Sequence, residues 1–123
     1  MLHIDFETRS RVDLLKEGVY NYATDPSTEA ICMAYAFGNE EPNLWIEGEE
    51  FPAAVVEYIE GGGVIAAHNA AFERLIFWYV ICPEHDVPEP ALEQFYCTAA
   101  QCRVSAYPGS LEEAALAIFG GVK

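Results

Sequence analysis

Two acidic residues separated by one position, Asp5 and Glu7, lie in a short apolar segment at the start of the chain. Residues 2–7 are predicted to form a strand, in which side chains two positions apart share a face, so both carboxylates point the same way with His3 beside them. Carboxylates held together repel each other, and a hard divalent cation such as Mg²⁺ relieves that repulsion. The alternative is an edge strand whose acidic face is simply hydrated.

A second group of polar side chains lies where a short predicted strand, residues 64–67, leads into a predicted helix, residues 70–81. Asn69 is expected to cap this helix, and Glu73 falls in its first turn. Helical side chains lean toward the N-terminus, so the Glu73 carboxylate returns toward the strand ends, where sheets place their sites. The alternatives are a hydrated Glu73, a Phe72 that belongs to the core and a His68 with a purely structural hydrogen bond.

The other predicted elements alternate between strands and helices, which indicates an α/β fold with a mixed sheet and helices packed against it. Pro83 is expected to end the helix that starts at residue 70. The remaining predictions are a helical turn at 12–19, strands at 30–37 and 43–46 joined by a hairpin turn at 38–42, a helix at 51–59, a strand at 94–98 and a helix at 110–119 capped by Ser110 and Glu113.

Length and composition place limits on the class of protein. The chain has 123 residues, of which 52% are hydrophobic, so residues 1–123 are expected to form one domain with a single core. No apolar run approaches the roughly 20 residues of a membrane span, and the start of the chain lacks the basic segment of a signal peptide. A cytoplasmic protein without membrane contact is therefore expected.

Charge and cysteine content argue against two further classes, although an acidic chain can still meet a phosphodiester through bound metal or through a basic neighbouring domain. The net charge of −14 argues against tight DNA binding by this chain alone, because phosphate contacts require Lys and Arg, and only six are present. Cys82 and His85 have zinc-ligand spacing, but no second pair completes a zinc site. The four cysteines, Cys32, Cys82, Cys97 and Cys102, are expected to be reduced thiols.

The order of the two acidic motifs resembles that of the DEDD 3′–5′ exonucleases of the ribonuclease-H-like superfamily. More narrowly, the chain resembles the N-terminal proofreading exonuclease region of bacteriophage-type family A DNA polymerases. The resemblance spans most of the chain, in the segments at residues 4–10, 13–22, 66–73 and 107–111. It implies a ribonuclease-H-like mixed sheet flanked by helices.

The resemblance also implies roles for individual residues. Asp5, Glu7 and Glu73 would be the catalytic carboxylates and the ligands of two Mg²⁺ or Mn²⁺ ions, which hydrolyse the 3′-terminal phosphodiester of single-stranded DNA by a two-metal mechanism. The residues that would bind the substrate are Thr8, His68, Asn69 and Phe72. The implied partners are the 3′ end of single-stranded DNA and a polymerase domain of the same full-length chain, in a bacterial cell or phage-infected host.

The chain departs from the family at a third motif, a Tyr or His followed four residues later by Asp on a late helix. No Asp occurs after Asp86, so the chain is expected to be a partial exonuclease domain without its C-terminal helix, inactive alone and prone to self-association through apolar surface left uncovered. Two alternatives remain open, a noncatalytic ribonuclease-H-like interaction module and an exoribonuclease of the same fold.

Overall fold

A mixed five-stranded sheet forms the centre of the molecule. The computed structural model describes residues 1–104, 110, 112 and 113. The sheet has the order β3-β2-β1-β4-β5, and its strands are β1 (Leu2–Arg9), β2 (Glu29–Phe37), β3 (Asn43–Ile46), β4 (Ile65–Ala67) and β5 (Phe95–Cys97). β2 runs antiparallel to β1 and β3, whereas β4 runs parallel to β1 and β5. The expected ribonuclease-H-like mixed α/β sheet is thus confirmed.

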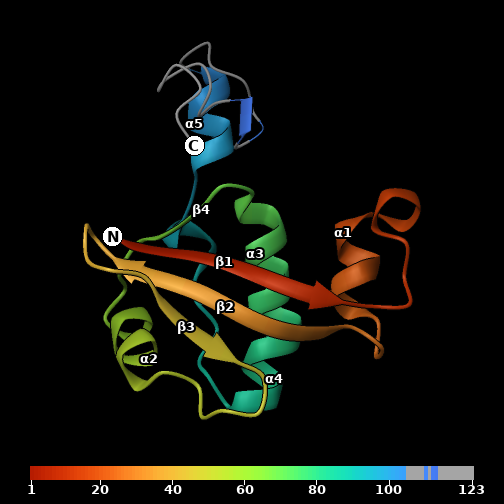
Figure 1. The fold of residues 1–123 in the computed structure, drawn as a ribbon, viewed down its shortest axis with the longest axis horizontal. Coiled ribbons are helices and arrows are strands. Elements are labelled where there is room, and N and C mark those ends of the chain that lie inside the picture. The colour runs from red at the N-terminus through yellow and green to blue at the C-terminus, as the bar shows by residue number, and fades with distance from the viewer. Residues whose placement is uncertain (105–109, 111, 114–123) are drawn as a thin grey trace.

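The helices pack mainly on one face of this sheet. They are α1 (Leu14–Thr24), α2 (Ala53–Glu60), α3 (Ala70–Ile76), α4 (Cys82–His85) and α5 (Thr98–Val104), with a π-helical segment η1 (Phe77–Ile81) and a 3₁₀ turn η2 (Leu92–Gln94). Figure 1 shows α3 passing behind β1 and β2 and leading to α4 below the strands, with α1 at one side and α5 set apart from the other helices. The face of β1, β2 and β3 that is turned to the viewer carries no described helix.

Alternation along β1 separates the core from the polar face. Leu2, Ile4 and Phe6 are at most 5% exposed and pack into the core beneath the helices, whereas the residues between them are exposed. The core continues through Met33 of β2 and Phe77 of η1, whose ring lies edge-on to Phe6. The predicted strand of residues 2–7 is confirmed, and its polar positions lie on the outer face of the sheet.

Because β4 is short, the edge of β1 that faces it is paired over only part of its length. β4 pairs with β1 only at Leu2 and His3, and then turns at His68 into α3. The edge of β1 from Ile4 onward therefore needs hydrogen-bond partners from elsewhere, because unpaired backbone N–H groups in a buried position are costly. This gap brings the start of α3 against β1.

The prediction that Pro83 ends the long helix is wrong. The chain stays helical from Ala70 to His85, but it passes through the wider turn of η1, in which the Cys82 N–H donates to the Phe77 carbonyl. Pro83 then lies in the first turn of α4, directly after this π-helical segment. The π-helical segment thus accommodates Pro83, and the helix continues to His85.

Other boundaries also differ from the sequence predictions. The turn expected at residues 12–19 is the longer α1, which starts after an Asp13 cap and contains a break at Gly18, where φ is 82°. α5 was not anticipated, because its short run of Thr, Ala and Gln carries no hydrophobic periodicity. The helix expected at residues 110–119 lies largely outside the described residues, although Ser110 Oγ accepts a hydrogen bond from the Glu113 N–H, as a cap would.

Two predictions about the whole chain concern cysteines and membranes. All four cysteines are free thiols, as expected. Within the described part of the chain, no helix is long and apolar enough to cross a membrane.

Candidate functional site

The two carboxylates of β1 lie on the outer face of the sheet. Asp5 and Glu7 are both exposed, and their β2 partners are Ala34 and Cys32. The small Ala34 and Cys32 side chains leave the carboxylates uncovered. The structure therefore confirms that Asp5 and Glu7 share a face, as the i, i+2 spacing predicts.

Glu73 reaches β1 from the first turn of α3. Its side chain is only 5% exposed, and its Oε2 accepts a hydrogen bond of 3.0 Å from the backbone N–H of Phe6. This N–H lies on the β1 edge that β4 leaves open, so the carboxylate takes the place of the missing strand neighbour. The sequence prediction that Glu73 leans back toward the strands is confirmed, and the hydrated alternative is excluded.

The surroundings of Glu73 disfavour its charged form. Burial is the main cause that raises the pKa of Glu73 to about 8, the negative charges of Asp5 and Glu7 contribute to the same shift, and the hydrogen bond from the Phe6 N–H opposes it. A carboxyl group with these neighbours needs either a proton or a cation near neutral pH. Asp5, Glu7 and Glu73 are thus electrostatically coupled, although they come from elements far apart in the sequence.

A pocket of about 390 Å³ opens where β1 passes the ends of β4 and β5. Its walls include Asp5 and Glu73, and the ends of parallel strands are where α/β sheets place ligands. The full lining is His3, Ile4, Asp5, Ala66, Ala67, His68, Asn69, Glu73 and Thr98. Glu7 is not part of this lining, since it lies farther along β1.

Two predicted substrate residues, His68 and Asn69, lie in the wall of the pocket. His68 Nδ1 is 2.9 Å from Thr98 Oγ1 and shares a hydrogen bond with it. Asn69 occupies the N-cap position of α3, as predicted, but its side chain makes no capping hydrogen bond. Its backbone carbonyl accepts from the N–H groups of Phe72 and Glu73, and its exposed amide lines the pocket instead.

The other two predicted substrate residues, Thr8 and Phe72, meet around Tyr22 of α1. Thr8 Oγ1 is 2.7 Å from the Tyr22 hydroxyl, and the Phe72 ring lies 6.0 Å from the Tyr22 ring. Neither Thr8 nor Phe72 lines the pocket. The four residues thus form two groups, one in the pocket wall and one beside α1.

The donor set suits a hard cation in its chemistry. Carboxylate oxygens are the preferred ligands of Mg²⁺ and Mn²⁺. A divalent cation would stabilise the charged form of Glu73, whose pKa is raised by burial and, beyond that, by the charges of Asp5 and Glu7. Among the residues that the structure describes, however, no three His, Cys, Asp or Glu side chains converge closely enough to hold a metal ion. Asp5 and Glu7 are exposed and able to change rotamer, whereas Glu73 is fixed by Phe6.

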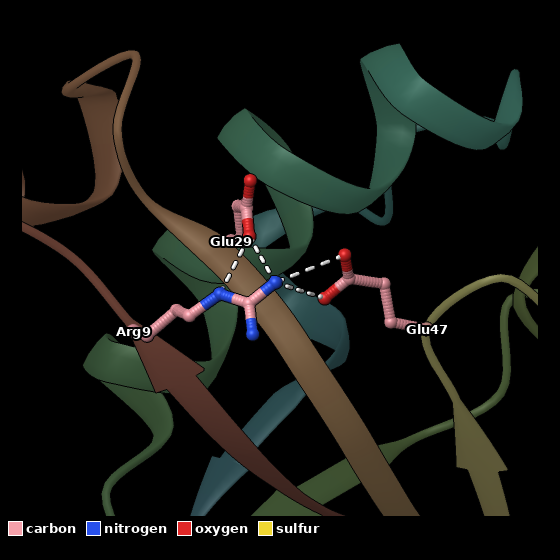
Figure 2. A network of polar contacts seen from close by, with 3 residues as sticks. All are labelled: Arg9, Glu29 and Glu47. Carbon is pink, nitrogen blue, oxygen red and sulfur yellow. Dashed lines mark hydrogen bonds and ion pairs between the residues drawn. The ribbon is translucent and has the colours of Figure 1, made fainter.

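Arg9, the basic residue at the end of β1, already forms ion pairs with acidic neighbours. Figure 2 shows the Arg9 guanidinium between Glu29 and Glu47, so that it links the end of β1 to the start of β2 and to the residue after β3. Arg9 Nε donates to Glu29 Oε2 at 2.6 Å, and both carboxylates raise the pKa of Arg9 above its ordinary value. Arg9 is therefore a poor candidate for a phosphate contact.

Thr98 and Tyr22 belong to the site region, but no local sequence pattern predicts their contacts, although Tyr22 lies in the resembling segment at residues 13–22. Thr98 follows β5 and reaches the pocket only because β5 pairs with β4. Tyr22 is one of two tyrosines in α1, and its contacts depend on how α1 packs against α3. Both placements follow from tertiary structure, which local spacing does not encode.

Comparison with known proteins gives one informative match. The chain is 35% identical over 124 aligned residues to the DNA polymerase of Bacillus phage SP02. The alignment covers 95% of this chain but only 18% of that polymerase. This similarity supports a relation to phage DNA polymerases. No protein-family model matches the chain.

Proposed function

We propose that this chain is the 3′–5′ proofreading exonuclease region of a phage-type DNA polymerase, acting on the 3′ end of single-stranded DNA with Mg²⁺ or Mn²⁺. The observation that carries the proposal is the coupling of Glu73, buried against β1, to Asp5 and Glu7. The similarity to a phage DNA polymerase supports the same reading. A buried carboxylate beside two exposed ones, whose negative charges add to its raised pKa, is an arrangement suited to binding cations.

The carboxylates have distinct roles in this proposal. Asp5 lines the pocket and would contact both cations, Glu7 would complete one site from farther along β1, and Glu73 would hold the second cation from α3. The cations would supply charge stabilisation for the phosphodiester and activation of a water molecule. The −14 charge of the chain is then partly offset at the site where an anionic substrate must approach.

Binding of the expected product tests this function on the chain itself. Calorimetric titration with dAMP is expected to show binding that requires Mg²⁺, because a phosphate and three carboxylates repel each other without a cation. Asp5→Asn and Glu73→Gln should each weaken it strongly, whereas Glu57→Gln on the exposed surface of α2 should not. Mg²⁺-dependent dAMP binding that survives Asp5→Asn would show that the site is elsewhere.

Two further measurements decide between the open alternatives. AMP differs from dAMP only by the 2′-hydroxyl, so tighter binding of AMP would favour an exoribonuclease. Hydrolysis of 5′-labelled single-stranded DNA with Mn²⁺ is expected to be very slow, since the sequence offers no Asp after Asp86 as a fourth ligand. Absence of both nucleotide binding and hydrolysis would favour a noncatalytic interaction module.

A further inference from the structure

The pairing of β4 with β5 places two polar residues side by side at the carboxyl ends of these strands. Ala67 is the partner of Cys97, so the residues that follow, His68 and Thr98, leave the sheet at the same level. Both side chains are half-buried, and both line the pocket that Asp5 and Glu73 also line. Their position is thus fixed by sheet register and not by a flexible loop.

The hydrogen bond between these two residues restrains the His68 ring. Nδ1 of His68 and Oγ1 of Thr98 are 2.9 Å apart, a normal length for a bond between an imidazole and a hydroxyl. A hydrogen bond at one ring nitrogen restrains the ring orientation, which determines what the remainder of the ring presents to a ligand. Thr98 therefore helps to set how His68 faces the pocket.

The chemistry of the pocket indicates why the orientation of the His68 ring matters for a ligand. Asp5 and Glu73 make part of the lining acidic, whereas His68, Asn69 and Thr98 contribute polar groups without negative charge. A nucleotide that binds near carboxylates needs hydrogen-bond donors for its sugar and phosphate oxygens as well as cations. These residues are placed to supply such donors.

From these contacts we infer that Thr98 is a positioning residue for nucleotide binding, acting through His68. The inference rests on the proposed function, because it assumes that the pocket takes a nucleotide. Thr98→Val keeps the shape of the side chain but removes its hydroxyl, whereas Thr98→Ser keeps the hydroxyl. Thr24→Val is a matched control, since the Thr24 hydroxyl bonds to the Tyr20 carbonyl on α1 and does not line the pocket.

Calorimetric titration of each variant with dAMP and Mg²⁺ tests the inference. Thr98→Val is expected to weaken binding about fivefold, the effect of one ordinary hydrogen bond, while Thr98→Ser and Thr24→Val keep the wild-type affinity. In a His68→Ala background, Thr98→Val should have no further effect, because the two residues act as one unit. A purely structural role for Thr98 predicts additive effects instead, and that result would overturn the inference.

A measurement on the unmodified chain avoids dependence on how well the variants fold. Addition of dAMP and Mg²⁺ should shift the imidazole ¹⁵N resonances of His68, while His85 provides an internal control because its ring packs against Trp45 and Phe51. Nucleotide binding that leaves His68 unchanged would contradict the inference but not the proposed function. Failure of the wild-type chain to bind dAMP would contradict both.

Discussion

The carboxylate of Glu73 accepts the backbone N–H of Phe6 at 3.0 Å, and this bond joins the first turn of α3 to the open edge of β1. One side chain thereby completes the hydrogen bonding of a strand and brings a third carboxylate toward Asp5 and Glu7. The arrangement places an ionisable group where burial and like charges both oppose ionisation. Stability and ligand binding are therefore coupled at this position.

The stability of the fold should depend on pH through Glu73. Its pKa is raised to about 8 in the folded chain, above its ordinary value of 4.5, so the folded state binds the proton more tightly than the unfolded state. The resulting stabilisation is complete below the ordinary pKa and is lost as pH rises through about 8. Glu73→Gln keeps an acceptor for Phe6 and should become the more stable form at alkaline pH.

Urea unfolding at about pH 5 and about pH 9 measures this effect. The difference in unfolding free energy between wild type and Glu73→Gln should grow by a few kcal/mol between these values. Glu57→Gln controls for the removal of one negative charge from an acidic chain, and it should show a much smaller change. A difference independent of pH would mean that Glu73 is ionised throughout.

Metal binding by the chain without nucleotide should be weak. The three carboxylates are coupled but do not converge on one point in the described part of the chain, so a cation must draw them together. Titration with Mn²⁺ should give an affinity weaker than micromolar, and Glu73→Asp should retain more of it than Glu73→Gln, because it keeps the charge. Low-micromolar binding that persists in Asp5→Ala would exclude Asp5 as a ligand.

Tyr22 should matter for nucleotide binding although it lies outside the pocket. Its hydroxyl holds Thr8, and its ring packs against Phe72, so it supports the two substrate residues predicted beside α1. Tyr22→Phe should reduce stability by about 1 kcal/mol through the lost hydrogen bond. It should also weaken binding of a single-stranded dinucleotide more than binding of dAMP, and equal losses for the two ligands would argue against this role.

Much of the fold was predictable because its signals are local. Alternation in β1 and the apolar run of β2 predicted strands that the structure confirms, and the Asn43–Ile46 segment matches its predicted strand. The behaviour of Pro83 was not predictable, because a helix continues past proline only when its backbone adjusts locally, here through the wider turn of η1. The sequence did not predict α5, because the start of this helix depends on where β5 ends.

The acidic part of the site was more predictable than its surroundings. Asp5 and Glu7 follow from strand periodicity, and Glu73 from its place in a helix first turn. The bond from Phe6 to Glu73 depends on how early β4 ends, and Thr98 reaches His68 only through the register of β4 and β5. Such contacts between distant segments require the three-dimensional structure.

The Arg9 network in Figure 2 should contribute to stability mainly at low ionic strength. Arg9, Glu29 and Glu47 are all substantially exposed, so salt screens their attraction. Arg9→Met is expected to lower the melting temperature in dilute buffer and to have little effect in concentrated salt. Lys16→Met serves as control, because among the residues that the structure describes the Lys16 side chain forms no ion pair. The same salt dependence in both variants would show that net charge alone is responsible.

Self-association should involve the outer face of the sheet. Leu44 and Ile46 of β3 are 57% and 47% exposed, and their β2 partners Ala34 and Cys32 add only small side chains. Exposed apolar surface of this kind promotes association, so light scattering at high concentration should detect dimers or larger species. Glu substitutions at Leu44 and Ile46 should restore a monomer, whereas Leu15→Glu on α1, where Leu15 is 97% exposed, should not. A wild-type chain that stays monomeric at every concentration would show that this face does not mediate self-association.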